Sequence, residues 1–126
     1  MKKTISVLAA ICLALSLCAC VSTKAPDDGR IKNIEVTVIH SDGTEKVFSY
    51  TTDMPYLGDI LQKEELIRGK NGQYGLEISH VDGEQADYNT DGAYWALYEG
   101  DTYATKGVDT LPIKDGGRYK LVYTVG

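Results

Sequence analysis

The sequence predicts an α+β fold in which a mixed sheet of about five strands packs against one short helix. Two observations lead to this class. Apolar residues alternate with polar ones in several short segments separated by turn-forming residues, which is typical of strands. Only the segment from Leu57 to Lys63 repeats apolar residues at helical spacing. The 126 residues leave room for one folded domain, and 43% hydrophobic and 25% charged residues are ordinary globular proportions.

The first nineteen residues are predicted to be a secretory signal peptide. Two lysines precede an apolar run from Ile5 to Leu17, which is shorter than the roughly 20 residues that a membrane-spanning helix needs. The run ends in Leu17-Cys18-Ala19-Cys20, which resembles a bacterial lipobox and implies cleavage after residue 19 and lipid attachment to Cys20. The alternative is an ordinary signal peptide, cut at the same bond, that leaves Cys20 free.

Lipidation would anchor the mature chain in the cell membrane, on its extracytoplasmic face. Burial of the acyl chains contributes about 0.8 kcal/mol per CH2, so several acyl chains give a stable membrane anchor. Residues 20–30 are predicted to be the lipidated cysteine and a flexible tether, because they are polar and show no periodicity. Cleavage removes two of the three cysteines, so residues 31–126 are expected to fold without an intramolecular disulfide.

The folded part begins with a predicted β-hairpin. Apolar residues alternate from Ile34 to Val38 and return from Val47 to Tyr50, on either side of the turn-forming residues 41–44. The two segments are therefore expected to pair as neighbouring strands.

A short helix is predicted next. Residues 51–53 (Thr-Thr-Asp) offer side-chain oxygens that can cap its first turn, and Pro55 suits an early helical position. Leu57, Ile60 and Leu61 then fall on one face, opposite to polar side chains. The helix is expected to lay this apolar face on the sheet.

Three more strands are expected after the helix. The glycine-rich residues 69–75 are predicted to end the helix as a loop, and strands are predicted at 76–81, 94–98 and 119–125. An acidic loop separates the first two. The order β-β-α-β-β-β, with the helix across the sheet, is the arrangement of β-grasp domains.

Short motifs run through residues 31–125 in a regular order. They are Leu57-Gly58-Asp59-Ile60-Leu61, Tyr74-Gly75-Leu76, Val81-Asp82-Gly83, Ala86-Asp87-Tyr88, Asp91 to Tyr98, Tyr103-Ala104, Gly107-Val108-Asp109 and Asp115-Gly116. On these motifs the chain is similar to the transcobalamin-like C-terminal domain family of bacterial lipoproteins. One departure is Glu99-Gly100, where relatives tend to have Asn-Gly.

The resemblance implies a protein that captures cobalamin or another corrinoid. The family resembles the smaller, β-rich domain of the animal cobalamin carriers, in which a helical domain and this domain close together on the corrinoid. The present chain matches only the β-rich part. No resident cofactor is expected beyond such a ligand.

Tyrosines are the candidate ligand contacts. The chain has nine tyrosines but one Phe and one Trp, and a tyrosine joins a large apolar ring to a hydroxyl. We predict that Tyr88, Tyr94, Tyr98 and Tyr103 form a shelf that stacks on a flat ligand such as a corrin ring. Trp95 is a further candidate, although strand alternation places it on the other face and favours the core. The alternative is that the tyrosines merely cover a small core.

Two other patterns are candidate metal sites. Residues 87–92 (Asp-Tyr-Asn-Thr-Asp-Gly) match the first half of a calcium loop, but Tyr98 occupies the position of the bidentate Glu, and Asx-type turns are the alternative. His40 and His80 each end an apolar strand. Both are predicted to be surface histidines at strand ends, and coordination of cobalt by an imidazole is the alternative.

Enzymatic activity and nucleic-acid binding are not expected. The sequence contains no nucleophile elbow, P-loop, dinucleotide motif or zinc motif. A net charge of −5 and a pI near 4.9 disfavour phosphate backbones as partners. We therefore predict a lipid-anchored, non-enzymatic protein that captures a corrinoid and passes it to a membrane importer. The alternative is an interaction module that pairs an exposed sheet edge with an envelope complex or an extracellular polymer.

Overall fold

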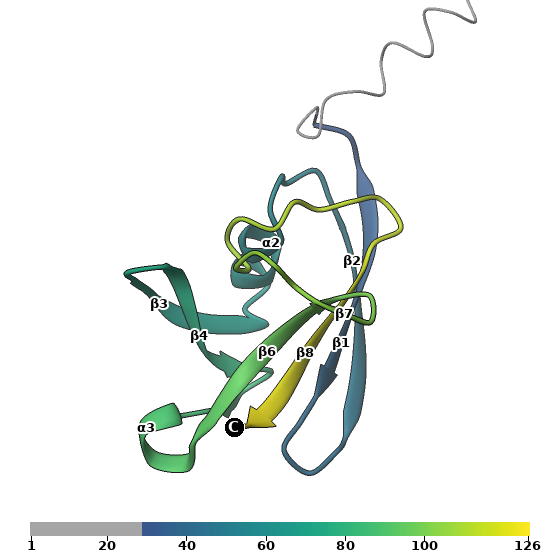
Figure 1. Cartoon of the computed structure of the whole chain (residues 1–126). Helices are drawn as coiled ribbons and strands as arrows, with labels where there is room; N and C mark the ends of the chain where they lie inside the picture. Colours follow the sequence, from purple (N-terminus) through teal and green to yellow (C-terminus); the bar gives the residue numbers. More distant parts are fainter. Residues whose placement is uncertain (1–28) are drawn as a thin grey trace, which may run out of the picture.

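A computed structural model describes residues 29–126, and it confirms the α+β class (Figure 1). The predicted signal peptide, Cys20 and most of the tether lie outside these residues. In chain order the elements are β1 (Lys32–Ile39), β2 (Glu45–Thr52), α2 (Leu57–Lys63), β3 (Ile67–Gly72), β4 (Gly75–Val81), β5 (Glu84–Gln85), α3 (Tyr88–Asp91), β6 (Ala93–Glu99), β7 (Thr102–Tyr103) and β8 (Arg118–Val125).

Five strands form the larger sheet, in the order β2-β1-β8-β6-β7. Strands β1 and β8 run parallel, and the other neighbours are antiparallel. The predicted alternation of β1 is confirmed, because Ile34, Val36 and Val38 are at most 3% exposed while the residues between them face outward. Val36 lies opposite Phe48 of β2 and Tyr119 of β8, so the centre of the sheet is also the centre of the core.

Helix α2 covers the inner face of this sheet with the predicted residues Leu57, Ile60 and Leu61, all buried. The predicted cap was wrong. Pairing with β1 extends β2 to Thr52, whose hydroxyl accepts a hydrogen bond from the amide of Met54. The first amides of the helix instead donate to backbone carbonyls of residues 108 and 111, in the long loop before β8. The loop thereby satisfies donors that a side-chain cap would otherwise serve.

A second, three-stranded sheet replaces the predicted loop at residues 69–75, in the order β3-β4-β5. Strand β3 escapes sequence patterning because its five residues after Ile67 are all exposed, so no alternation marks it. Gly69 permits the close approach of β3 and β4 at a bulge, where a Cβ would overlap the carbonyl of Glu77. Elements β5, α3 and β7 were also not expected.

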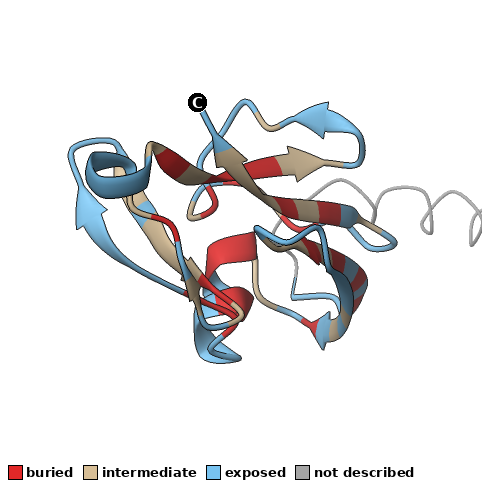
Figure 2. Cartoon of the chain, turned by 90° about the horizontal axis from the view of Figure 1, so that it is seen from below, coloured by how far each residue is buried: buried red, intermediate tan, exposed pale blue. Residues whose placement is uncertain are grey.

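The core lies between α2, the inner face of the larger sheet and the buried ends of β3 and β4. Figure 2 shows buried segments concentrated in α2 and the central strands, whereas α3 and most of β3 are exposed. Within residues 29–126, no helix is long and apolar enough to cross a membrane.

Candidate functional site

Strand β6 presents tyrosines on the face opposite to the core. Trp95 and Leu97 point inward and are 6% and 8% exposed, while Tyr94 and Tyr98 on the other face are half-buried. Tyr103 of β7 lies directly opposite Tyr98 in the antiparallel register, so both side chains emerge on the same side. The alternation predicted for residues 94–98 is therefore confirmed.

The four predicted tyrosines lie next to one another. The ring centres of Tyr98 and Tyr103 are 5.4 Å apart, and those of Tyr88 and Tyr94 are 6.5 Å apart. Desolvation raises the pKa of the Tyr103 hydroxyl, and a hydrogen bond and charge interaction with Tyr94 raise it further. Tyr94 thus links the two pairs. We call Tyr88, Tyr94, Tyr103 and Tyr98, in this order, the tyrosine row.

A groove of about 710 Å³ opens beside one end of the row, between the smaller sheet and the start of β6. Its apolar lining consists of Ile78, Ala86, Ala93 and the rings of Tyr88 and Tyr94. This volume lies within the range of roughly 300–1,000 Å³ that is usual for small-molecule sites. The tyrosine row therefore borders a concave surface.

A second, smaller hollow of about 200 Å³ shares Ile78 with the groove and includes Tyr103. Trp95 and Leu97 also line this hollow. The hollow therefore brings the other end of the tyrosine row close to a concavity as well.

His80 adds a polar group with a defined donor pattern to the groove. The Ser79 hydroxyl donates to the carbonyl of Arg68 at 3.1 Å, which uses its single proton. The Ser79 hydroxyl oxygen therefore accepts a hydrogen bond from Nδ1 of His80, 2.8 Å away. In this tautomer, Nε2 of His80 is left as an acceptor. Histidines that bind metals also donate from their other ring nitrogen, so Nε2 of His80 is available as a single acceptor at the groove.

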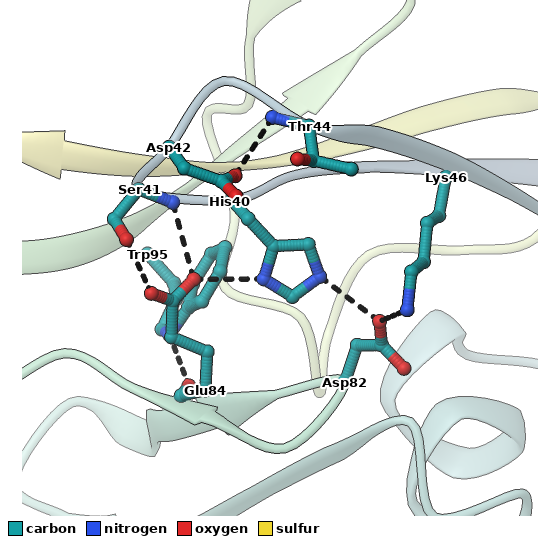
Figure 3. A network of polar contacts seen from close by, with 8 residues as sticks. All are labelled: His40, Ser41, Asp42, Thr44, Lys46, Asp82, Glu84 and Trp95. Carbon is teal, nitrogen blue, oxygen red and sulfur yellow. Dashed lines mark hydrogen bonds and ion pairs between the residues drawn. The ribbon is translucent and has the colours of Figure 1, made fainter.

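His40, predicted as a surface histidine, lies instead between two carboxylates (Figure 3). Its Nδ1 is 2.7 Å from Oε1 of Glu84, and its Nε2 is 2.9 Å from Oδ2 of Asp82. The ring is 13% exposed and meets Trp95 edge-on. Sequence reasoning missed this cluster because the carboxylates follow His40 by more than forty residues.

A structure from Ruminococcus gnavus ATCC 29149 shows the family of the chain. That protein, described as a candidate metal-binding protein, is 41% identical in sequence. The match covers 75% of this chain and 98% of that chain, with a TM-score of 0.73. The chain belongs to the same family. A scan against protein-family models finds no match, and neither does a search of curated proteins.

The structure of haptocorrin in complex with Cbi (cobinamide) is also similar to this chain. It is 14% identical, with a TM-score of 0.63, over 77% of this chain and 26% of the haptocorrin chain. At this identity the match shows a shared fold. It agrees with the fold that the resemblance to the cobalamin carriers implied.

Trp95 takes the place in the core that its strand face favoured. Its Nε1 donates to the carbonyl of Glu84 at 3.2 Å, and its ring packs edge-on against Tyr123. A ligand in the smaller hollow would meet Trp95 there, while the groove is lined without it. Trp95 therefore supports the site from the core side.

In this chain the calcium-like motif at residues 87–92 caps helix α3. The carboxylate of Asp87 accepts from the amide of Asn89 at 3.0 Å and from the hydroxyl of Thr90 at 2.9 Å. This is the Asx-type turn expected as the alternative. Across residues 29–126, no group of three or more His, Cys, Asp and Glu side chains is placed to bind a metal ion.

Proposed function

We propose that the chain is a non-enzymatic binding protein that captures a small flat ligand, and that the ligand is a corrinoid. The observation that carries the proposal is the row of four adjacent tyrosines beside the groove. Aromatic faces stack on planar apolar groups, and phenol hydroxyls can hydrogen-bond to a polar edge. A corrin ring with amide side chains offers both kinds of surface.

Two relatives support this ligand class. Haptocorrin shares the fold and is described in complex with Cbi, and the R. gnavus family member is described as a candidate metal-binding protein. Both descriptions suit a cobalt corrinoid, because its metal arrives inside a flat organic ring. A preassembled metal complex needs no cluster of protein ligands, and Nε2 of His80 would supply a single donor toward the cobalt.

The proposed cellular role rests on the predicted lipobox. We propose that lipid on Cys20 anchors the chain at the extracytoplasmic face of the cell membrane, where it passes its ligand to an importer. We also propose that the chain is not an enzyme, and that the tyrosines, amides and charged side chains along the groove serve to hold the ligand. Capture and delivery need affinity and release, and no bond has to be made or broken.

Cobinamide binding tests the proposal directly. Residues 21–126, which omit the predicted signal peptide and Cys20, are mixed with cobinamide and desalted. The visible spectrum of the protein fraction is recorded, and calorimetric titration then measures the affinity. We expect colour to co-elute with the protein. We also expect the double variant Tyr94→Ala, Tyr98→Ala to lose most of the affinity while remaining folded.

Tyr74→Ala is the matched control, because Tyr74 is 89% exposed and lies outside the tyrosine row. It should bind cobinamide as the parent chain does. Colourless protein at high micromolar concentration would exclude corrinoid capture. An equal loss of affinity in the control would exclude the tyrosine row as the contact surface.

Strand β2 favours a second candidate function, docking of a protein partner. This eight-residue strand is an edge of the larger sheet and pairs with β1 alone among the described strands. Val47 on β2 is 59% exposed. An edge of this kind can accept a further strand from a partner. Failure of cobinamide binding would favour this function.

A further inference from the structure

The two carboxylates around His40 require a charged ring. A neutral imidazole has one N–H, so it can donate to Asp82 or to Glu84 but not to both. Both nitrogens lie within 2.9 Å of a carboxylate oxygen, which matches donation from each (Figure 3). The imidazolium form therefore satisfies this geometry, and the neutral form leaves one carboxylate facing a ring lone pair.

Residues around His40 tie the two sheets together. Ser41, beside His40, donates to Glu84 from both its amide and its hydroxyl. Lys46 of β2 reaches Asp82 at 3.0 Å. Together with the bond from the indole of Trp95, these contacts bind residues 82–84 to β2, to β6 and to the turn that follows β1. We call His40, Ser41, Lys46, Asp82 and Glu84 the His40 cluster.

The His40 cluster adjoins one wall of the groove. Glu84 directly precedes residues 85–89, which line the groove from Gln85 to Asn89. This wall is joined to β4 by the two-residue strand β5 and by one further backbone hydrogen bond, from the amide of Ala86 to the carbonyl of Ser79. Beyond these contacts with β4, the side chain of Glu84 connects this wall to the larger sheet through His40 and Ser41.

We propose that His40, in its protonated form, is a positioning residue for the groove, which holds residues 85–89 against the larger sheet and releases them when the ring loses its proton. The effect on a ligand rests on the function proposed above. The effect on residues 85–89 does not, because it belongs to the chain without ligand.

Electrostatics give the direction of the pH effect. Desolvation lowers the pKa of His40, but hydrogen bonds and charge interactions with Glu84 and Asp82 outweigh it, and the pKa lies above 6.5. Asp42 in the adjoining turn adds a further negative charge near the ring, and Lys46 keeps its pairing with Asp82. A raised pKa means stabilisation that is complete below the unfolded value and is lost as pH rises through the folded value.

The carboxylates limit the effect at the acidic end. The pKa of Asp82 is lowered against the opposing effect of burial by hydrogen bonds from Lys46 and His40, and that of Glu84 is lowered first of all by the Ser41 hydroxyl. Their contribution is present above their unfolded pKa values and is lost as pH falls through the folded values. The His40 cluster is therefore most stable between these acidic values and the pKa of His40.

Hydrogen exchange of the chain without ligand tests the proposal. The His40 ring is titrated by NMR, and amide protection of residues 84–89 and of β1 and β8 is measured from about pH 6 to about pH 9, corrected for intrinsic exchange. We expect protection of residues 84–89 to fall as pH passes the pKa of His40, while β1 and β8 keep theirs. A ring that titrates at or below 6.5, or protection without a step, would overturn the proposal.

Three variants keep the result interpretable. His40→Gln should abolish the step, and His80→Gln, which removes the other histidine, should retain it. Glu84→Gln keeps the shape of the acceptor but not its charge, so the pKa of His40 should fall and the step should move to lower pH. A step that persists in His40→Gln would contradict the proposal, even if one of the other variants failed to fold.

Cobinamide affinity separates this inference from the proposed function. If the chain binds cobinamide and His40 positions the groove, the affinity for cobinamide should fall roughly fivefold or more between about pH 6 and about pH 9, which is the lower end of typical coupling between sites. His40→Gln should remove most of this pH dependence. An exchange step without cobinamide binding at any pH would leave the role of His40 standing and reject the ligand. Cobinamide binding with no exchange step and no pH dependence would support the ligand and reject the role of His40.

Discussion

The two sheets of the molecule are stabilised by different interactions. Alternate residues of β1 in the larger sheet are at most 3% exposed, whereas β3 in the smaller sheet buries only its first residue. Polar contacts of the His40 cluster and a bond from the amide of Leu76 to the carboxylate of Asp109 supplement the smaller sheet's limited burial. The larger sheet thus depends mainly on apolar burial, and the smaller one depends more on polar contacts.

Truncation of a residue at the centre of the core should cause the largest loss in the free energy of unfolding. Leu121 in β8 is fully buried, so Leu121→Ala removes buried methyl groups and leaves a cavity that costs about 2–5 kcal/mol. Leu76→Ala in β4 should cost less, because Leu76 is only half-buried at the edge of the core. Chemical denaturation measures both, and equal costs would contradict the difference between the sheets.

The larger sheet was predictable for the same reason that it is stable. Burial on one face produces alternation, and this pattern identified β1, β6 and β8 from the sequence. Strand β3 has one buried residue and two glycines, so it resembles a loop in sequence. Its pairing depends on β4, and such long-range pairing is not visible in a local pattern.

The candidate site was predictable in part. Strand alternation separated Tyr94 and Tyr98 from Trp95 correctly, because it depends only on neighbouring residues. The groove and the His40 cluster were not predictable, because each joins residues from distant segments. The excess of tyrosine was a signal for the groove. The two acidic residues after β4, Asp82 and Glu84, gave no distinctive signal for the His40 cluster.

A methyl group at Gly69 should disturb the smaller sheet selectively. In Gly69→Ala the new Cβ would overlap the backbone carbonyl of Glu77, so β3 and β4 must move apart. We expect a cost of about 1–3 kcal/mol, as for other overpacked positions, and a loss of protection confined to β3 and β4. Gly126→Ala is the control, since its Cβ meets only the Tyr94 ring, at an ordinary contact distance of 3.4 Å. Loss of protection throughout the larger sheet would show that the two sheets are not separable.

Removal of the cap of α3 should have a smaller effect. Asp87→Ala deletes the acceptor for the amide of Asn89 and the hydroxyl of Thr90, at a typical cost of about 1 kcal/mol. Asp87→Asn keeps an acceptor oxygen and should recover most of the loss. Thermal unfolding measures both variants. A marked rise of the melting temperature on addition of calcium would contradict the assignment of this segment as a cap.

The smallest expected effect concerns the continuity of the tyrosine row. Because Tyr94 contributes to the raised pKa of Tyr103, Tyr94→Phe should lower that pKa toward its ordinary value near 10, without changing stability measurably. Tyr56→Phe is the control, since Tyr56 lies outside the row at the start of α2. NMR titration of the Tyr103 ring gives the measurement. If Tyr94→Phe left the pKa of Tyr103 unchanged, Tyr94 and Tyr103 would act separately, and the four rings would offer a ligand two small contacts in place of one continuous surface.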